Sequence, residues 1–195
     1  MLQIQRFLFV AILLIVTVYS NAQSWFSTAG FYAVPGSVRE VFDFNAGWKF
    51  HQGNISGAEK TNFDDSRWEV VATPHSVQLV PAAASGGKNY QGIVWYRKHF
   101  RTPEDFSGKK IVLYFEAIMG KSVIYVNGKK LQEHSGGFLP VIIDLTNAGV
   151  TANQDVLVSV MADNSDDPSY PPGKPQTALD FCYFGGIYRD CWLYT

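Results

Sequence analysis

Short runs of residues in which apolar and polar side chains alternate are the feature that most limits how this chain can fold. Residues 110–117 place Ile111, Leu113 and Phe115 on one side, and residues 93–101 alternate in the same way. A repeat of two residues is the side-chain period of a β-strand, so each run is expected to present one face to a core. The predicted strands cover residues 48–51, 93–101, 110–117, 123–126, 141–145, 155–162 and 186–195.

The connections between these runs are rich in Gly, Asn and Pro, and no stretch after residue 22 has the period of a convincing amphipathic helix. Asn127-Gly128 is the preferred pair for a two-residue type I′ turn, because both residues of that turn need a positive φ. Lys129 and Lys130 open the following strand, and lysine discourages pairing with another sheet edge. Short strands joined by such turns predict an all-β sandwich or barrel.

Two segments interrupt the pattern of short strands. Residues 80–91 are small and flexible in composition, and residues 163–181 are long and rich in proline and charge. Loops of this length are uncommon in compact domains and often carry function, although a surface excursion without function is the alternative.

The first residues have the pattern of a secretory signal peptide. Arg6 precedes an apolar run from residue 7 to residue 19, and Ser20-Asn21-Ala22 has the small residues of a cleavage site. A membrane anchor is the alternative, but the apolar run is short for spanning a bilayer. We therefore predict a signal peptide over residues 1–22, a lead-in over residues 23–37, and export to the periplasm or the extracellular space.

The charge and the cysteines exclude some classes of function. A formal net charge of −1 gives no electrostatic reason to expect nucleic acid or an anionic membrane as a partner. An exported chain could join Cys182 and Cys191 in a disulfide, and two buried apolar thiols are the alternative. Two cysteines and four scattered histidines lack the spacing of metal ligands, so neither a metal nor a cofactor is predicted.

Catalytic groups are not evident in the sequence. Glycoside hydrolysis needs two carboxylates that face one bond, and neither Glu116 nor Asp64 can be assigned a partner. The chain has 5 Trp, 10 Tyr and 14 Phe, which could stack on sugar rings or fill a core. For Trp48, Trp95 and Trp192, which lie in alternating strands, we predict core packing.

Six motifs occur together in one order along the chain. They are FDFNAGWKF (42–50), FDDSRWEVVATPH (63–75), GIVWYRKHF (92–100), VIYVNGKKLQEHSGGFLPVIIDLT (123–146), ADNS (162–165) and GGIYRDCWL (185–193). Together they resemble the N-terminal sugar-binding domain of glycoside hydrolase family 2, which contains β-galactosidases, β-glucuronidases and β-mannosidases. The resemblance extends over residues 38–195.

The resemblance implies a jelly-roll β-sandwich that precedes an immunoglobulin-like domain and a (β/α)₈ barrel in the same polypeptide. In the family the barrel carries both catalytic glutamates, one of them in an Asn-Glu pair, and no glutamate here follows an asparagine. The chain therefore resembles a non-catalytic fragment of an exported retaining glycosidase, most similar to a β-galactosidase. We expect the polypeptide to continue past Thr195.

The resemblance also implies where a carbohydrate would be contacted. The family contacts its substrate from the loop after the strand that ends in ADNS, which corresponds here to Asp163 and Asn164, with Arg189 as an orienting partner. The alternatives to a glycosidase domain are a free-standing carbohydrate-binding module and a scaffold domain without a sugar site, because jelly rolls serve many functions.

Overall fold

The computed structural model describes residues 40–195, apart from residues 82, 83, 85 and 87. The predicted signal peptide and lead-in lie outside the described residues. The elements are β1 (Val41–Asp43), β2 (Trp48–Gln52), β3 (Glu69–Val71), β4 (Ile93–Arg101), η1 (Glu104–Phe106), β5 (Val112–Phe115), β6 (Lys121–Val126), β7 (Lys129–Ser135), β8 (Val141–Asp144), β9 (Asp155–Asp163), η2 (Gln176–Ala178) and β10 (Cys191–Tyr194).

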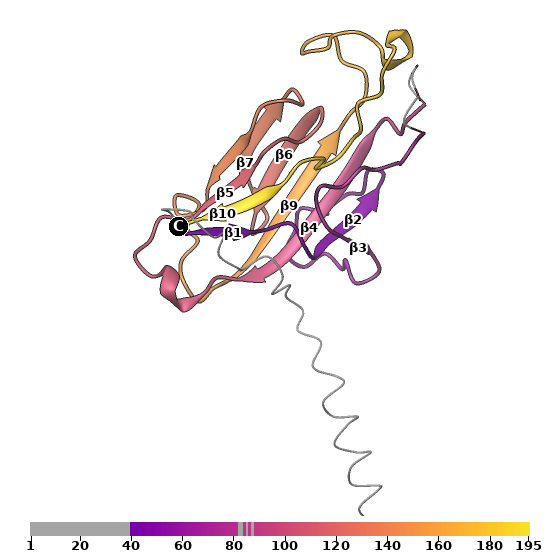
Figure 1. Cartoon of the computed structure of the whole chain (residues 1–195). Helices are drawn as coiled ribbons and strands as arrows, with labels where there is room; N and C mark the ends of the chain where they lie inside the picture. Colours follow the sequence, from indigo (N-terminus) through magenta and orange to yellow (C-terminus); the bar gives the residue numbers. More distant parts are fainter. Residues whose placement is uncertain (1–39, 82–83, 85, 87) are drawn as a thin grey trace, which may run out of the picture.

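The strands form two antiparallel sheets that pack face to face (Figure 1). The smaller sheet has four strands in the order β1-β10-β5-β8, and the larger has six in the order β3-β2-β4-β9-β6-β7. The prediction of an all-β jelly-roll sandwich is confirmed. The C-terminus lies at one end of the sandwich, and the long segment between β9 and β10 projects from the other end.

The core lies between the two sheets and is built from the predicted alternating positions. On β4, the side chains of Val94, Tyr96 and Phe100 are buried in it. On β5, Leu113 and Phe115 face them from the smaller sheet. These strands therefore direct every second side chain into this core, which is why a period of two was sufficient to place these residues.

Lys98 lies on the same inward face of β4 and is fully buried. Its Nζ donates to the carbonyl oxygens of Phe44 and Ala46 at 2.8 and 2.7 Å and lies 3.7 Å from the centre of the Phe44 ring. Burial lowers the pKa of Lys98 to about 7. The ammonium group thus joins the turn between β1 and β2 to the middle of the larger sheet.

A second, smaller core covers the outer face of the larger sheet. Trp95 of β4 packs there against Trp68 and Ala58, which belong to the segment between β2 and β3. Arg97, two residues along β4, is also fully buried, and its Nε donates to Asp65 Oδ2 at 2.7 Å. Core packing is therefore confirmed for Trp48 and Trp95, although Trp95 belongs to this second cluster.

Core packing is wrong for Trp192. Along β10, Cys191 and Leu193 point into the core, so Trp192 points outward and is only half-buried. Its Nε1 donates to Glu116 Oε1 at 3.0 Å. The physical reason is the register of β10, which places the smaller residues on the covered side and the largest on the open side.

The predicted hairpin is confirmed, with φ values of 49° at Asn127 and 80° at Gly128. Its second strand, β7, is at an edge of the larger sheet and begins with the two predicted lysines. The last strand is shorter than predicted, because residues 186–190 leave the sheet and only Gly186 forms a bridge, with Met119. The three-residue strand β1 was not predicted.

Candidate functional site

The loops that surround the end of β9 form the candidate site. This end of the sandwich contains residues 163–190, the segment that leads into β4, and the turn before β6 (Figure 1). The predicted substrate residues Asp163 and Asn164 are at its centre, because β9 ends at Asp163.

Asn164 is buried and holds three segments together. Its Oδ1 accepts the backbone N–H of Gly92 at 2.9 Å, and its Nδ2 donates to the carbonyl oxygen of Tyr90 at 2.7 Å. Its own carbonyl oxygen accepts Gln176 Nε2 at 3.1 Å. A Cβ at residue 185 would lie 2.7 Å from Asn164 Nδ2, so this close approach requires Gly185. The side chain positions the loops, and its predicted contact with substrate stays a prediction.

Asp163 is half-buried at the base of the long loop. Its Oδ1 accepts the backbone N–H of Ser165 at 2.9 Å, which turns the chain out of β9. Gly120 approaches so closely that a Cβ there would lie 2.0 Å from the carbonyl oxygen of Asp163. The carboxylate therefore lies at a fixed place at the rim, and it is a hydrogen-bond acceptor of the kind that a sugar hydroxyl can use.

The long loop is held against the sandwich by its own acidic residues. Asp167 forms an ion pair with Lys121 of β6 at 2.5 Å, and hydrogen bonds from Lys121 and Ser169 lower the pKa of Asp167 to about 2. Asp166 Oδ1 accepts the backbone N–H of Gln176 at 2.9 Å. These contacts order the loop within the chain itself.

Arg189 is exposed just before β10. Its guanidinium carbon lies 5.4 Å from the centre of the Tyr188 ring, and the Tyr188 hydroxyl donates to the carbonyl oxygen of Gly137 at 2.5 Å. Among the described residues, no hydrogen bond or ion pair joins Arg189 to Asp163 or Asn164. The orienting role that the resemblance implies for Arg189 therefore stays a prediction.

The half-buried His75 and the fully buried Tyr96 are in contact beneath the same loops, and the sequence did not predict this contact. His75 Nδ1 lies 2.8 Å from the Tyr96 hydroxyl, and the backbone N–H of His75 donates to the carbonyl oxygen of Ile187 at 2.8 Å. Burial lowers the pKa of His75 and raises that of Tyr96. A Cβ at residue 186 would lie 2.2 Å from the Tyr96 hydroxyl, so Gly186 permits the contact. In the sequence, the adjacent glycines Gly185 and Gly186 were the only indication that side chains approach the backbone closely here.

Both cysteines are free thiols, so the structure does not contain the disulfide between Cys182 and Cys191. Cys191 points from β10 into the core, and burial raises its pKa to about 12. Cys182 is half-buried in the loop that precedes β10. The alternative of a buried apolar thiol therefore describes Cys191.

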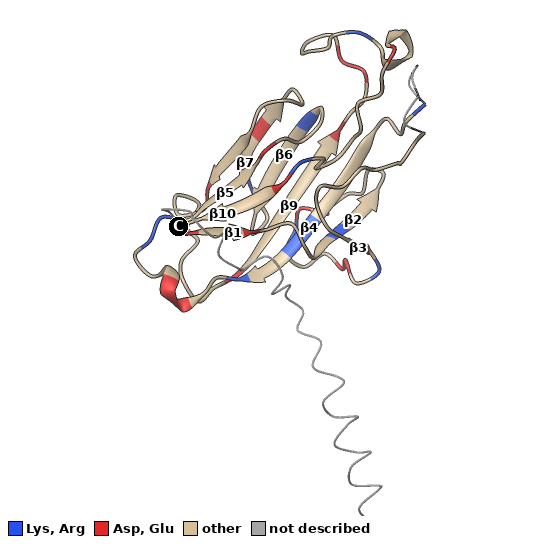
Figure 2. Ribbon diagram, in the orientation of Figure 1, with Lys and Arg blue, Asp and Glu red and all other residues tan. Residues whose placement is uncertain are grey.

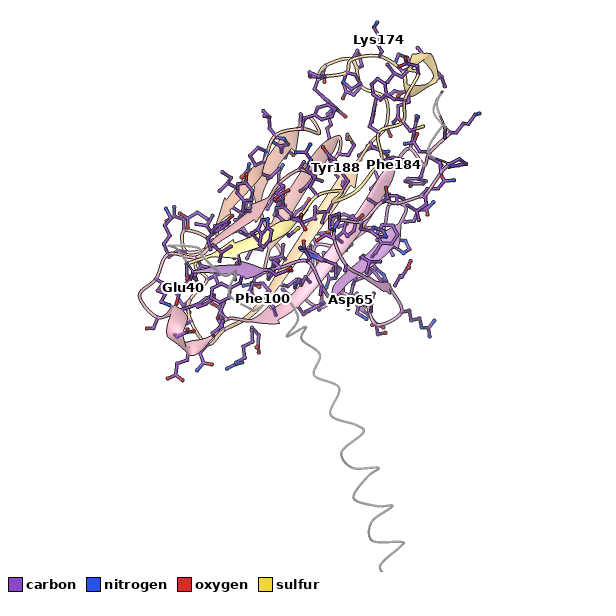
Figure 3. All side chains as sticks on the ribbon, in the orientation of Figure 1. Glu40, Asp65, Phe100, Lys174, Phe184 and Tyr188 are labelled. Carbon is purple, nitrogen blue, oxygen red and sulfur yellow. The ribbon has the colours of Figure 1, made fainter. Side chains whose placement is uncertain are left out.

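Aromatic side chains gather where the long loop returns to the sheet. Figure 3 shows Phe184 and Tyr188 near the base of the loop and Lys174 at its tip. Phe181 is 48% exposed, and its ring centre lies 6.2 Å from that of Tyr183. An exposed ring can stack on the apolar face of a sugar, and a carboxylate can accept hydrogen bonds from its hydroxyls.

The described residues contain neither a group of metal ligands nor a membrane-spanning helix. In residues 40–195 without the four gaps, no three His, Cys, Asp or Glu side chains are grouped as metal ligands. Within the same part of the chain, no helix is long and apolar enough to cross a membrane.

Comparison with known proteins gives three consistent results. Residues 55–195 match the family described as "Glycosyl hydrolases family 2, sugar binding domain". A β-galactosidase of Thermoanaerobacter pseudethanolicus is 36% identical over 155 residues, which are 80% of this chain and 21% of that protein. A β-glucuronidase of Formosa agariphila is 31% identical over 173 residues, which are 83% of this chain and 18% of that protein.

The fold is also found in solved structures of larger enzymes. The crystal structure of Bacteroides uniformis β-glucuronidase matches with a TM-score of 0.70 and 32% identity, over 80% of this chain and 18% of that one. The chain thus spans about a fifth of the length of the proteins it matches.

Proposed function

The chain belongs to the sugar-binding domain of the family 2 glycosyl hydrolases, and on this premise we propose that it is a non-catalytic part of an exported retaining glycosidase. The match over residues 55–195, set against a relative of which it covers only 21%, is the observation that carries the proposal. In this role the chain shapes the mouth of an active site, and the catalytic carboxylates belong to another domain of the same polypeptide.

A neutral β-galactoside is the proposed substrate. The relative that is 36% identical is a β-galactosidase, whereas several others are β-glucuronidases. The rim carboxylates of Asp163 and Asp166 also favour a neutral sugar, since the charge of Asp167 is already balanced by its ion pair with Lys121. A glucuronide carries a carboxylate, which these aspartates would repel.

The two neighbouring residues at the end of β9 have different proposed roles. Asp163 accepts a hydrogen bond from a substrate hydroxyl, and Asn164 keeps Asp163 in place by holding the loops around it. In the longer polypeptide, Asp163→Ala should lower kcat/KM by an amount that corresponds to about 1–3 kcal/mol and leave stability nearly unchanged. Asn164→Ala should instead destabilise the chain alone by about 2 kcal/mol, measured by urea unfolding.

The activity test compares the chain with the longer polypeptide of its gene. The chain alone should not hydrolyse nitrophenyl β-galactoside, β-glucuronide or β-mannoside, and the longer polypeptide should prefer the galactoside. Turnover by the chain alone that is lost in Glu116→Gln would contradict the non-catalytic role. Cell fractionation tests export, since a cytoplasmic product with its first 22 residues intact would contradict the signal peptide.

A free-standing carbohydrate-binding module is the second candidate, favoured by the exposed Phe181 ring beside Tyr183. Titration calorimetry of the chain with a β-galactan distinguishes the two candidates. Two results together would support the module. The chain should bind the galactan at least about tenfold more weakly in Phe181→Ala, and its reading frame should stop at Thr195.

A further inference from the structure

The outer face of the smaller sheet carries a row of large apolar side chains. The register places Trp192, Tyr114 and Ile142 side by side across β10, β5 and β8. Ile142 is 53% exposed, and Trp192 and Tyr114 are half-buried. The next row adds Tyr194 and Val112. A continuous apolar surface of this kind is unusual on an isolated soluble domain and is typical of an interface.

The surface continues beyond the edge of the sheet. Phe138 and Leu139, in the segment that leads into β8, are 49% and 69% exposed. Figure 2 shows the ribbons of β5 and β10 without charged residues, consistent with their sequences VLYF and CWLY. Apolar and aromatic residues with few charges are the composition of the buried centre of a protein interface.

Carboxylates border this row, and one of them is paired with a lysine. Glu116 accepts the indole N–H of Trp192 at 3.0 Å, and Asp144 forms an ion pair with Lys110 at 3.0 Å. The indole edge is therefore already used within the chain. Tyr114 and Tyr194 meet nearly edge to face, with ring centres 5.9 Å apart and planes at 82°. These rings do not form the flat platform on which a sugar ring stacks, so the surface fits a protein better than a carbohydrate.

We propose that this face is where the remaining part of a family 2 polypeptide packs on the chain. The proposal rests on the proposed function, in which the chain is one domain of a longer protein. About four fifths of the matched β-galactosidase lies outside the aligned part. A longer polypeptide of that kind would contain enough further chain to cover the face. Its contacting surface is apolar at the centre and presents Arg, Lys or N–H donors opposite Glu116.

The test places a lysine at the centre of the face in two polypeptides, the chain ending at Thr195 and the longer product of its gene. Ile142→Lys should leave the thermal midpoint of the short chain unchanged, because the side chain is already exposed there. In the longer protein it should lower the midpoint of the transition that includes this domain by on the order of 5 °C. Val70→Lys is the matched control, since Val70 is 64% exposed on β3, at an edge of the larger sheet.

The control should have no effect in either polypeptide. Equal, negligible effects of Ile142→Lys and Val70→Lys in the longer protein would overturn the inference and leave the proposed function standing. A reading frame that stops at Thr195 would overturn the proposed function and the inference with it. The inference would also be overturned if the short chain sedimented as a dimer and Ile142→Lys dissociated that dimer, because a second copy would then cover the face.

Discussion

Trp95 and Trp192 both lie on the outer faces of their sheets, but only Trp95 is covered. Residues of the segment between β2 and β3 pack on Trp95, and the ion pair of Arg97 with Asp65 holds that segment in place. On the smaller sheet, Trp192 is half-buried beside Tyr114 and Ile142. The strand pattern alone does not distinguish the outer faces of the two sheets. The segment between β2 and β3 is what covers the outer face of the larger sheet within the domain.

The largest expected effect comes from Arg97, which holds the covering segment on the outer face of the larger sheet. Arg97→Ala should destabilise the chain by about 3–5 kcal/mol, because Asp65 would lose its buried partner and the carbonyl oxygens of Lys60 and Phe63 would lose a donor. Chemical denaturation measures the loss. Arg101→Ala is the control on the same strand, since its ion pair with Asp155 is exposed and should contribute about 0–1 kcal/mol. Similar losses in both variants would contradict the sealing role.

Trp68, which covers the larger sheet, and Trp192, on the smaller sheet, should also differ in how much stability the chain loses when each is truncated. Trp68→Ala removes a side chain that is 9% exposed in the second core and should cost about 3 kcal/mol in unfolding free energy. Trp192→Ala removes a half-buried ring with one hydrogen bond and should cost about 1 kcal/mol in the chain alone. A loss at Trp192 that equals the loss at Trp68 would show that the smaller sheet is also covered within the chain.

Low pH should remove the stability that Asp65 contributes to the covered face of the larger sheet. Burial by itself would raise the pKa of Asp65, but hydrogen bonds from His99 and Arg97 outweigh burial and hold the pKa below its ordinary value. The group therefore binds its proton more readily in the unfolded chain, and it stabilises the fold above its unfolded pKa, near 4. This stabilisation should disappear as pH falls through the lower folded pKa. Stability measured from pH 6 to pH 2 should fall less steeply in Asp65→Asn than in the unchanged chain.

The smallest expected effect is on the open face. Ile142→Thr should change the stability of the chain alone by no more than about 0.5 kcal/mol, because the side chain is largely in water. Ile143→Thr, the next residue on β8, is 2% exposed in the main core and should cost about 2 kcal/mol. A melting experiment on the two variants checks the comparison, and equal melting points would show that β8 does not have one open side.

Much of the fold was predictable because it depends on local patterns. The period of two placed Val94, Tyr96 and Phe100 on one buried face of β4, and Asn127-Gly128 identified the hairpin turn. The ordered motifs identified the family. The role of Asp65 was harder to recognise, because a turn rich in aspartate accounts for the residue without any distant partner. Its partner Arg97 lies 32 residues away, and only the folded chain joins them.

The candidate site was predictable in place and less so in chemistry. The strand was expected to end at Ala162, and β9 ends one residue later, at Asp163. The sequence could not show that the Asn164 amide bonds to the backbone at Tyr90 and Gly92, more than 70 residues earlier. Nor could it show that His75 meets Tyr96 under the glycine pair, since each contact depends on three segments that converge in space.

The sequence by itself determined which side chains of each strand share a face, because alternation is a local property of an extended backbone. It also determined the turn at Asn127-Gly128. The tertiary structure alone decided what each face meets: the main core for Leu193, the second core for Trp95, and an open surface for Trp192. The physical reason is that alternation divides residues into two sets, whereas burial depends on which distant segment packs against each set.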